Sequence, residues 1–361
     1  MRTENEPVMK IGRRSVGGRA PAFIIAELSA NHGQKLETAL KSVRAAAKAG
    51  ADAIKIQTYT PDTLTIDSKK KYFRINHDTL WDGRTLYDLY KEAYTPWDWH
   101  YKIKRAAADE GLVFFSTPFD RTAVDFLEEL GVPVYKVASF EMTDIPLIKY
   151  IAACRKPVIM STGISTLTEI AEAEAACRKA GGGRPALLKC TSSYPTTFPE
   201  MNLRTMPDLG RRFGCLTGLS DHSVGITAPV AAVVLGAKIL EKHFILDRKL
   251  GGPDAQFSLN PTEFAAMVKA VREAEVALGR VTYKLSARVR KSRMFARSLF
   301  VVKDIALGET FTENNVRSIR PGYGLPPKYL DKVLGRRATR VITAGTPLSR
   351  GLIKGSTKWA Q

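Results

Sequence analysis

The stretch LTGLSDHSVGITAPVAAVVLGAKILEKHF, from Leu216 to Phe244, decides the fold of this chain. It predicts a strand, a helix over Gly225–Ala237 and a second strand, with a histidine near the carboxyl end of each strand. The helix is built from small apolar residues that suit packing against a sheet, so we expect the two strands to be parallel neighbours. Because parallel strands end at the same edge, His222 and His243 are predicted to converge on one point.

These two histidines are candidate metal ligands. Two neutral imidazoles with no nearby cysteine suit a divalent cation that keeps positions open for water or substrate, whereas a closed structural site needs four protein ligands. The alternative interpretation is that each histidine caps a strand or fills the core.

The same alternation of strand and helix extends over most of the chain. Before Leu216 we expect the strands Phe23–Ser29, Ala53–Tyr59, Val113–Pro118, Val134–Ser139, Val158–Gly163 and Ala186–Ser192. Helical periodicity follows them over Lys35–Ala49, Pro96–Glu110, Arg121–Leu130, Ile145–Cys154, Leu167–Ala180 and Leu203–Phe213, and a closing helix is expected over Pro261–Leu278. Eight strands that each precede a helix predict an α/β fold, the (β/α)8 or TIM barrel.

Polar residues recur toward the carboxyl ends of these apolar strands. They are Glu27, Lys55, Gln57, Ser116, Thr117, Lys136, Ser139, Ser161, Thr162, Lys189, Ser192, Asp221, His222, Glu241 and His243. Burying polar groups costs free energy unless they have partners, and barrel enzymes keep their active sites at this face. Three lysines beside hydroxyl groups predict a bound dianion such as phosphate together with a carboxylate. For any single lysine, a salt bridge in the core is the alternative.

The loop from Thr60 to Thr95 is unusually long for a barrel turn and is rich in aromatic residues. Loops of this length are commonly binding loops or lids. A compatible alternative is that its aromatic residues pack an extra helix over Arg84–Ala93.

The sequence pattern divides the chain into four parts. We expect an N-terminal hairpin over residues 1–21, the catalytic barrel over 22–279, a linker over 280–297, and a small domain with a tail over 298–361. From Arg280 onward there are 18 Lys and Arg against 4 Asp and Glu, which accounts for most of the net charge of +19. No nucleic-acid motif or interleaved aromatic residues accompany this charge, so a lid that attracts small anions explains it better than a nucleic-acid partner does.

Composition also bounds the cellular setting. The first twenty residues lack the apolar segment of a signal peptide, and no run of eighteen apolar residues occurs. We therefore expect a cytoplasmic protein without a membrane partner. The four cysteines have no metal-ligand spacing and are expected to be reduced.

Nine strings of the sequence, in order, resemble the sialic acid synthase family. They are AELSANHG (Ala26–Gly33), DAIKIQTY (Asp52–Tyr59), STPFD (Ser116–Asp120), YKVASFE (Tyr135–Glu141), MSTG (Met160–Gly163), KCTSSYPT (Lys189–Thr196), GLSDHS (Gly218–Ser223), ILEKHF (Ile239–Phe244) and GPDAQFSLNP (Gly252–Pro261). The resemblance spans nearly the whole chain and implies a C-terminal antifreeze-like (SAF) domain. Members are transferases that condense phosphoenolpyruvate with an N-acetylated amino sugar to give a nonulosonic acid.

Two stretches favour the pseudaminic acid branch of that family, namely Leu80–His100 and Ser192–Tyr194. Sialic acid synthases usually carry asparagine at the position of Ser192, and a Gly-Ile-Asn run where this chain has Leu28–Asn31. A hydroxyl must then replace an amide at one phosphoenolpyruvate contact. The implied acceptor is 2,4-diacetamido-2,4,6-trideoxy-L-altrose; N-acetylneuraminate and legionaminic acid synthases, which use other N-acetylated sugars, are the alternatives.

The resemblance also implies roles for individual residues. His222 and His243 would hold Mn²⁺, with Mg²⁺ or Co²⁺ as alternatives, to polarise the C1 aldehyde of the open-chain sugar. The carboxylate and phosphate of phosphoenolpyruvate would be held by Lys55, Gln57, Thr117, Lys136, Ser139, Ser161, Ser192 and Ser220. Tyr194 and Asp254 would contact the sugar, and Arg320 from the partner chain of a domain-swapped homodimer would reach its acyl group.

A carboxylate is needed to position or deprotonate the water that completes the reaction. Glu27 is the first candidate, with Glu141 or Glu241 as second choices, and salt bridges to the neighbouring lysines are the competing explanation for all three.

Two other classes of protein fit parts of the pattern. A Schiff-base aldolase on the same barrel would use Lys136 or Lys189 as its nucleophile, although the two histidines argue against it. A non-catalytic carbohydrate-binding protein would retain the barrel and the lid.

Overall fold

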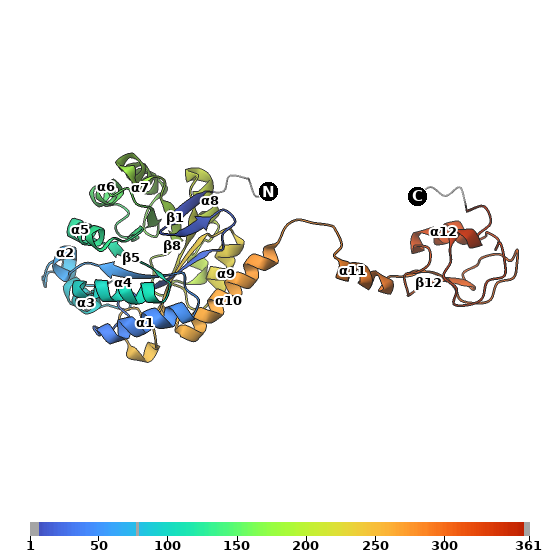
Figure 1. The fold of residues 1–361 in the computed structure, drawn as a ribbon, viewed down its shortest axis with the longest axis horizontal. Coiled ribbons are helices and arrows are strands. Elements are labelled where there is room, and N and C mark those ends of the chain that lie inside the picture. The colour runs from blue at the N-terminus through green and yellow to red at the C-terminus, as the bar shows by residue number, and fades with distance from the viewer. Residues whose placement is uncertain (1–6, 77–78, 357–361) are drawn as a thin grey trace. The chain divides into compact units, whose positions relative to one another are not determined.

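The computed structural model describes residues 7–76 and 79–356. The chain divides into two compact units, Met1–Gly279 and Arg280–Gln361. The first unit contains a closed barrel of parallel strands with helices around the outside (Figure 1). The predicted α/β class and (β/α)8 architecture are confirmed.

The barrel strands follow one another in chain order, and the last pairs with the first. They are β3 (Phe23–Glu27), β4 (Ala53–Thr58), β5 (Val113–Pro118), β6 (Tyr135–Val137), β7 (Val158–Ser161), β8 (Ala186–Cys190), β9 (Thr217–Asp221) and β10 (Ile239–His243). In this register His243 of β10 lies beside Glu27 of β3, while Glu241 lies beside Ser220 of β9. The polar residues of neighbouring strand ends are therefore held side by side.

Helices connect the strands and bury their apolar faces against the barrel. They are α1 (Leu36–Lys48), α4 (His100–Asp109), α5 (Arg121–Leu130), α6 (Ile145–Ala153), α7 (Leu167–Cys177), α8 (Thr205–Phe213), α9 (Thr227–Val234) and α10 (Pro261–Leu278). Local sequence fixes where several of them begin. The Asn260 side chain accepts from the Glu263 amide to form a capping box, and Pro261 occupies the first turn of α10.

A hairpin of β1 (Val8–Ile11) and β2 (Arg14–Gly17) lies at the amino-terminal end of the barrel strands. A Cβ atom at Gly17 would collide with the Pro7 carbonyl and with the Leu216 side chain, so the hairpin packs directly against the start of β9. Glycine at this position also suits the backbone, whose φ is +98°.

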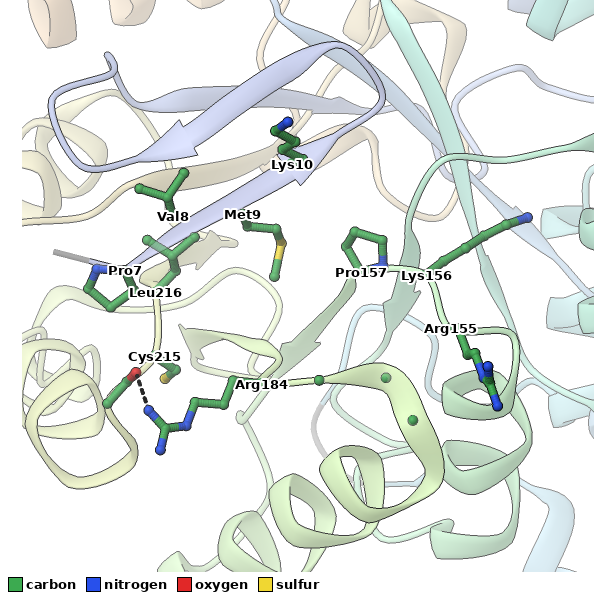
Figure 2. Close-up of a pocket in the computed structure, with 14 residues that line it drawn as sticks. Pro7, Val8, Met9, Lys10, Arg155, Lys156, Pro157, Arg184, Cys215 and Leu216 are labelled. Carbon is green, nitrogen blue, oxygen red and sulfur yellow. Dashed lines mark hydrogen bonds between the residues drawn. The ribbon is translucent and has the colours of Figure 1, made fainter. Parts of the chain in front are cut away.

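A hollow of about 600 Å³ lies beside this hairpin (Figure 2). Residues that precede β7, β8 and β9 line it together with β1, so it belongs to the amino-terminal end of the barrel. The charged ends of Lys10, Arg155 and Lys156 point in different directions, and Arg184 donates to the Gly214 carbonyl at 3.3 Å. No carboxylate is among the residues that line the hollow in the described chain.

The long loop after β4 folds into short elements. They are α2 (Pro61–Leu64), the 3₁₀ turn η1 (Lys71–Phe73), α3 (Leu86–Ala93) and the turn η2 (Trp97–Trp99). The extra helix expected over Arg84–Ala93 is therefore present as α3, capped by the Thr85 side chain, which accepts from the Asp88 amide.

The second unit has its own apolar core. Its short elements are α11 (Ala287–Ser292), β11 (Ser298–Val301), β12 (Val316–Ile319) and α12 (Leu330–Val333), and β11 pairs antiparallel with β12. Leu299, Val301, Phe311 and Leu348 are fully buried there. Among the described residues, no helix has the length and apolar character needed to cross a membrane.

Candidate active site

A cavity of about 530 Å³ opens at the carboxyl ends of the barrel strands. The predicted site residues that line it are Glu27, Lys55, Gln57, Thr117, Lys136, Ser139, Glu141, Ser161, Ser192, Tyr194, Ser220, His222, Glu241, His243 and Asp254. Arg320 belongs to the second unit, where it is exposed directly after β12.

Strand alternation decides which polar residues reach this cavity. Successive side chains of a strand point to opposite faces, so Ser220 and His222 point inward while Asp221 points toward the helices. The sequence pattern grouped Ser116, Thr162, Lys189 and Asp221 with the cavity residues, and that grouping is wrong, because none of the four lines it. Lys189 instead donates to the Thr191 hydroxyl at 3.2 Å.

Lys55 is the centre of the first charged group in the cavity. Its ammonium lies 2.8 Å from Glu27 Oε2 and 3.8 Å from Glu241 Oε2, and it donates to the Thr117 hydroxyl at 3.1 Å. Gln57 donates to Glu27 Oε1 at 3.1 Å. Thr117 and Gln57 thus hold the Lys55–Glu27 pair in one arrangement.

Lys136 is the centre of the second group. It donates to the Ser161 hydroxyl at 2.6 Å and lies 3.9 Å from Glu241 Oε1. Ser220 donates to the same Glu241 oxygen at 3.0 Å. Glu241 therefore bridges the two lysines, which keeps two buried ammonium groups near each other despite their like charge.

These surroundings shift the pKa values of the carboxyl groups differently. Burial raises the pKa of Glu27 to about 7, although Lys55 opposes the shift. The pKa of Glu241 is lowered overall. Burial alone would raise it, but the ammonium groups of Lys136 and Lys55 have the larger combined effect. Glu241 is thus the fixed anion of the cluster, while Glu27 can exchange a proton near neutral pH.

Hydroxyl groups gather on the side of the cavity formed by β6, β7 and β8. Ser192 donates to the Ser139 hydroxyl at 2.9 Å, and Ser139 accepts from the Ile164 amide at 3.0 Å. A Cβ atom at position 163 would collide with both hydroxyls, so Gly163 is required for this close approach. Ser192 therefore faces the cavity, although it is shorter than an asparagine.

The two histidines meet across the ends of β9 and β10. Their ring centroids are 5.3 Å apart. Nδ1 of His222 faces the Thr191 carbonyl oxygen at 3.0 Å, which leaves Nε2 available to a ligand. Burial lowers the pKa of His243 well below its usual range, so this ring is neutral and can offer a lone pair.

A buried ion pair fixes the two strands that carry these rings. Lys242 and Asp221 are register partners, and Lys242 Nζ lies 2.7 Å from Asp221 Oδ2 with both side chains 1% exposed. Lys242 also donates to the Ser223 carbonyl, and the Ser223 amide donates to Asp221 at 2.9 Å. Asp221 directly precedes His222, and Lys242 directly precedes His243. The ion pair therefore fixes the distance between the two strand ends that carry the histidine rings.

The side chains around the histidines fit an open cation site. His243 Nδ1 is buried without a hydrogen-bond partner in the described chain and lies 3.6 Å from Asp254 Oδ2. Within residues 7–76 and 79–356, no group of three or more His, Cys, Asp and Glu side chains is arranged to hold a metal ion. A cation held by the two imidazoles would have to complete its coordination with water or substrate.

Three further residues complete the polar surface. The Tyr194 ring packs against His222, with centroids 4.5 Å apart. Burial raises the pKa of Asp254 and raises that of Glu141 to about 7. Glu141 Oε2 is buried and has no hydrogen-bond partner within the described residues, so it can accept from a bound ligand.

Sequence reasoning missed several contributors to the cavity, among them Cys190 and the loop after β4. Cys190 lines it and lies 3.9 Å from His222 Nδ1, contrary to the expectation of no nearby cysteine. Its position two residues before Ser192, on the same side of an extended chain, was the available signal. The loop after β4 supplies a wall of mixed chemistry, in which apolar residues such as Ile75 and Leu89 lie with Tyr72, Arg74 and Thr79; the aromatic content of the loop only suggested such a wall.

Comparison with known proteins identifies the family. A model of the NeuB family matches residues 42–283, and a model of the SAF domain matches residues 296–353. The chain belongs to the NeuB family. The resemblance carried by the nine sequence strings is confirmed.

This NeuB-family chain has close relatives along nearly its full length. It is 50% identical over 329 residues to a pseudaminic acid synthase of Campylobacter jejuni, covering 91% of this chain and 96% of that protein. A pseudaminic acid synthase of Helicobacter pylori is 45% identical, with 93% and 99% of the two chains covered. The crystal structure of a sialic acid synthetase from Leptospira borgpetersenii, in complex with citrate, has a TM-score of 0.71 and 32% identity, covering 80% of this chain and 95% of that one.

Proposed function

We propose that this chain is a pseudaminic acid synthase. It condenses phosphoenolpyruvate with 2,4-diacetamido-2,4,6-trideoxy-L-altrose and water to give pseudaminic acid and phosphate. The observation that carries the proposal is 50% identity over 91% of the chain to the Campylobacter jejuni enzyme, against 32% to the sialic acid synthetase of known structure.

Phosphoenolpyruvate would bind where the buried cations gather. Lys55 and Lys136 are 3% and 2% exposed, with Glu241 near both and Glu27 paired with Lys55. When Glu27 takes up a proton, for which its pKa is about 7, one of the two positive charges is left to be balanced by an incoming anion. The hydroxyls and the amide on either side can donate to carboxylate and phosphate oxygens. We assign this role to Lys55, Gln57, Thr117, Lys136, Ser139, Ser161, Ser192 and Ser220.

His222 and His243 would hold a divalent metal, with Mn²⁺ as first choice and Mg²⁺ or Co²⁺ as alternatives. When bound, the metal supplies Lewis acidity that polarises the C1 aldehyde of the open-chain sugar. The Thr191 carbonyl orients the His222 ring for this role, and the Asp221–Lys242 pair holds the two histidine-bearing strands together.

The covalent steps balance without an oxidant or reductant. The C3 carbon of phosphoenolpyruvate attacks C1 of the open-chain sugar, so a C–C bond forms, the C1=O π bond breaks, and positive charge develops at C2. Water adds at C2 and loses one proton, while the former aldehyde oxygen takes up a proton and becomes a hydroxyl. The C2–O bond to phosphate then breaks as the new C2 hydroxyl loses its proton, which leaves with inorganic phosphate, and C2 becomes a ketone. The lysines hold the phosphate as its negative charge grows.

Glu27 is our first candidate to position that water and take its proton. Its pKa of about 7 suits a group that must accept a proton near neutral pH. Glu141 is the second candidate, because it also has a pKa of about 7 and a free buried oxygen. Glu241 is less suited, because the two lysines lower its pKa and thereby weaken it as a base.

The sugar would lie between the histidines and the loop after β4. Tyr194 and Asp254 border this space, with Tyr194 against His222 and Asp254 beside His243. We also propose a domain-swapped homodimer in which the partner chain contributes Arg320 to the sugar site. The exposure of Arg320 in the second unit is compatible with that role.

The choice of sugar is tested by measuring phosphate release from phosphoenolpyruvate with three acceptors side by side. These are 2,4-diacetamido-2,4,6-trideoxy-L-altrose, N-acetylmannosamine and the legionaminic acid precursor. We expect the first to react with a kcat/KM at least 100-fold above the others. Equal rates with all three would contradict the choice of branch, and trapping of a pyruvate adduct by borohydride would favour a Schiff-base aldolase instead.

A further inference from the structure

Ser29 has a backbone conformation that is unusual for its residue type. It lies two residues after the end of β3, in a tight turn that the Asn31 amide closes by donating to the Leu28 carbonyl at 3.0 Å. The φ of Ser29 is +44°, in the left-handed region that glycine adopts more easily than other residues. Such conformations cost free energy and are often found at functional sites, so the Ser29 side chain calls for an explanation.

The Ser29 hydroxyl contacts the group that holds the first candidate base. Ser29 lines the carboxyl-terminal cavity and is 5% exposed. Gln57 Nε2 donates to Ser29 Oγ at 2.9 Å and to Glu27 Oε1 at 3.1 Å. The amide nitrogen of Gln57 is therefore held between the Ser29 hydroxyl and the Glu27 carboxylate.

The same hydroxyl also contacts Asp254. A hydroxyl that accepts one hydrogen bond can still donate its own proton. Burial raises the pKa of Asp254, and a hydrogen bond from Ser29 opposes that shift. The Ala30 amide donates to Asp254 Oδ2 at 3.5 Å, and the same oxygen lies 3.6 Å from His243 Nδ1. Ser29 thus stands in the middle of a chain of polar contacts that runs from Glu27 to His243.

These contacts explain a side chain in a turn that suits glycine. Glycine at position 29 would remove one acceptor from Gln57 and one donor from Asp254, which is itself buried. Buried polar groups that lose a partner cost more free energy than exposed ones do. The two hydrogen bonds of the hydroxyl therefore compensate for the strained backbone.

We propose that Ser29 is a positioning residue for the water-activating carboxylate. Its hydroxyl holds the Gln57 amide against Glu27 and ties this group to Asp254, beside the histidine pair. The inference rests on the proposed function, in which Glu27 is the first candidate base. It assigns to the turn after β3 the task of keeping that base in place during the reaction.

The test removes the hydroxyl with and without the backbone strain. Ser29→Ala keeps the Cβ atom in the left-handed conformation, whereas Ser29→Gly relieves it, so Ser29→Gly should unfold at the higher temperature of the two. We expect both variants to lose about 5- to 20-fold in kcat for phosphate release, because both lack the two hydrogen bonds. The KM for phosphoenolpyruvate should change less than threefold.

The pH–rate profile adds a readout that general damage to the fold would not produce. Burial raises the pKa of Glu27, and donation from Gln57 opposes that shift because it favours the ionised carboxylate. Without Ser29 to hold the amide, the pKa of Glu27 should rise further. The ascending limb of the profile should therefore move to higher pH in both Ser29→Ala and Ser29→Gly.

Ser42→Ala is the matched control. Ser42 is also buried, but its hydroxyl donates to the Thr38 carbonyl at 2.9 Å on α1 and it does not line the cavity. This variant should keep kcat within twofold of the wild type and leave the limb in place.

Ser29→Gly decides the outcome, also if Ser29→Ala does not fold. Wild-type kcat and an unmoved limb in Ser29→Gly would overturn the inference, because the hydroxyl would then be dispensable, and would leave the proposed function standing. Absence of phosphate release by the wild-type protein with all three acceptor sugars would instead overturn the proposed function, and this inference with it.

Discussion

The barrel unit has a hollow at each end, and the two differ in chemistry far more than in size. The amino-terminal hollow measures about 600 Å³ and the carboxyl-terminal cavity about 530 Å³. In the first, Lys10 and Arg155 are exposed and their charges diverge (Figure 2). In the second, Lys55 and Lys136 are buried and share Glu241. Convergence of buried polar groups, and not volume, therefore marks the candidate active site.

Substitution of either histidine should cause the largest loss of activity and so separate the two hollows most clearly. We expect His222→Ala and His243→Ala each to reduce phosphate release at least 1000-fold, because either change removes half of the proposed protein ligands to the metal. Lys10→Ala and Arg184→Ala change residues of the other hollow and should stay within twofold of the wild type. Near-normal turnover in either histidine variant would remove the metal role.

Glu27→Gln should have the next largest effect, a loss of roughly 100-fold or more in kcat. A base must be deprotonated to act, so the wild-type rate should rise with pH up to about 7, the pKa of Glu27, and level off above it. The glutamine variant cannot titrate and should lack this limb of the pH–rate profile. If the limb persists in Glu27→Gln and disappears in Glu141→Gln, the base is Glu141.

The lysines allow a matched comparison within the carboxyl-terminal face. Lys136→Met should lower kcat/KM for phosphoenolpyruvate about 10- to 100-fold, since a hydrogen bond to a charged group contributes about 1.5–3 kcal/mol. Lys189→Met makes the same change at a strand residue whose side chain does not line the cavity. We expect less than a threefold effect there, and similar losses in both variants would mean that general charge, not placement, attracts the substrate.

The buried pair behind the histidines should give the smallest effect on the site. Asp221→Asn leaves Lys242 buried without its anion, and we expect Mn²⁺ affinity to fall about tenfold, the lower end for partners that orient metal ligands. Unfolding should also become easier by about 3–5 kcal/mol. Unchanged Mn²⁺ affinity, measured by isothermal titration calorimetry on the folded variant, would reduce the pair to a structural role.

The barrel could be predicted from the sequence because its strands are short apolar segments at regular spacing. Val113–Pro118 and Arg121–Leu130 were predicted with the bounds that the structure has. Polar residues at the strand ends also identified the face that carries the cavity. These features depend on local pattern, which a sequence contains directly.

The inward or outward direction of each polar residue could not be predicted in the same way. Strands of a parallel barrel are buried on both faces, so the apolar pattern does not mark which set of alternate residues faces inward. Lys189 and Cys190 are adjacent on β8, and only the cysteine lines the cavity. The Asp221–Lys242 pair and the cavity wall formed by the loop after β4 likewise depend on contacts between segments that are separated in sequence.

The central claim is that the two imidazoles of the carboxyl-terminal cavity hold a divalent cation. The most direct test is a titration of the full-length protein with Mn²⁺, in which electron paramagnetic resonance reports the free ion. We predict that the wild-type protein removes Mn²⁺ from solution and that the His222→Ala/His243→Ala double variant binds it at least 100-fold more weakly. Binding of equal affinity by the folded double variant would contradict the account.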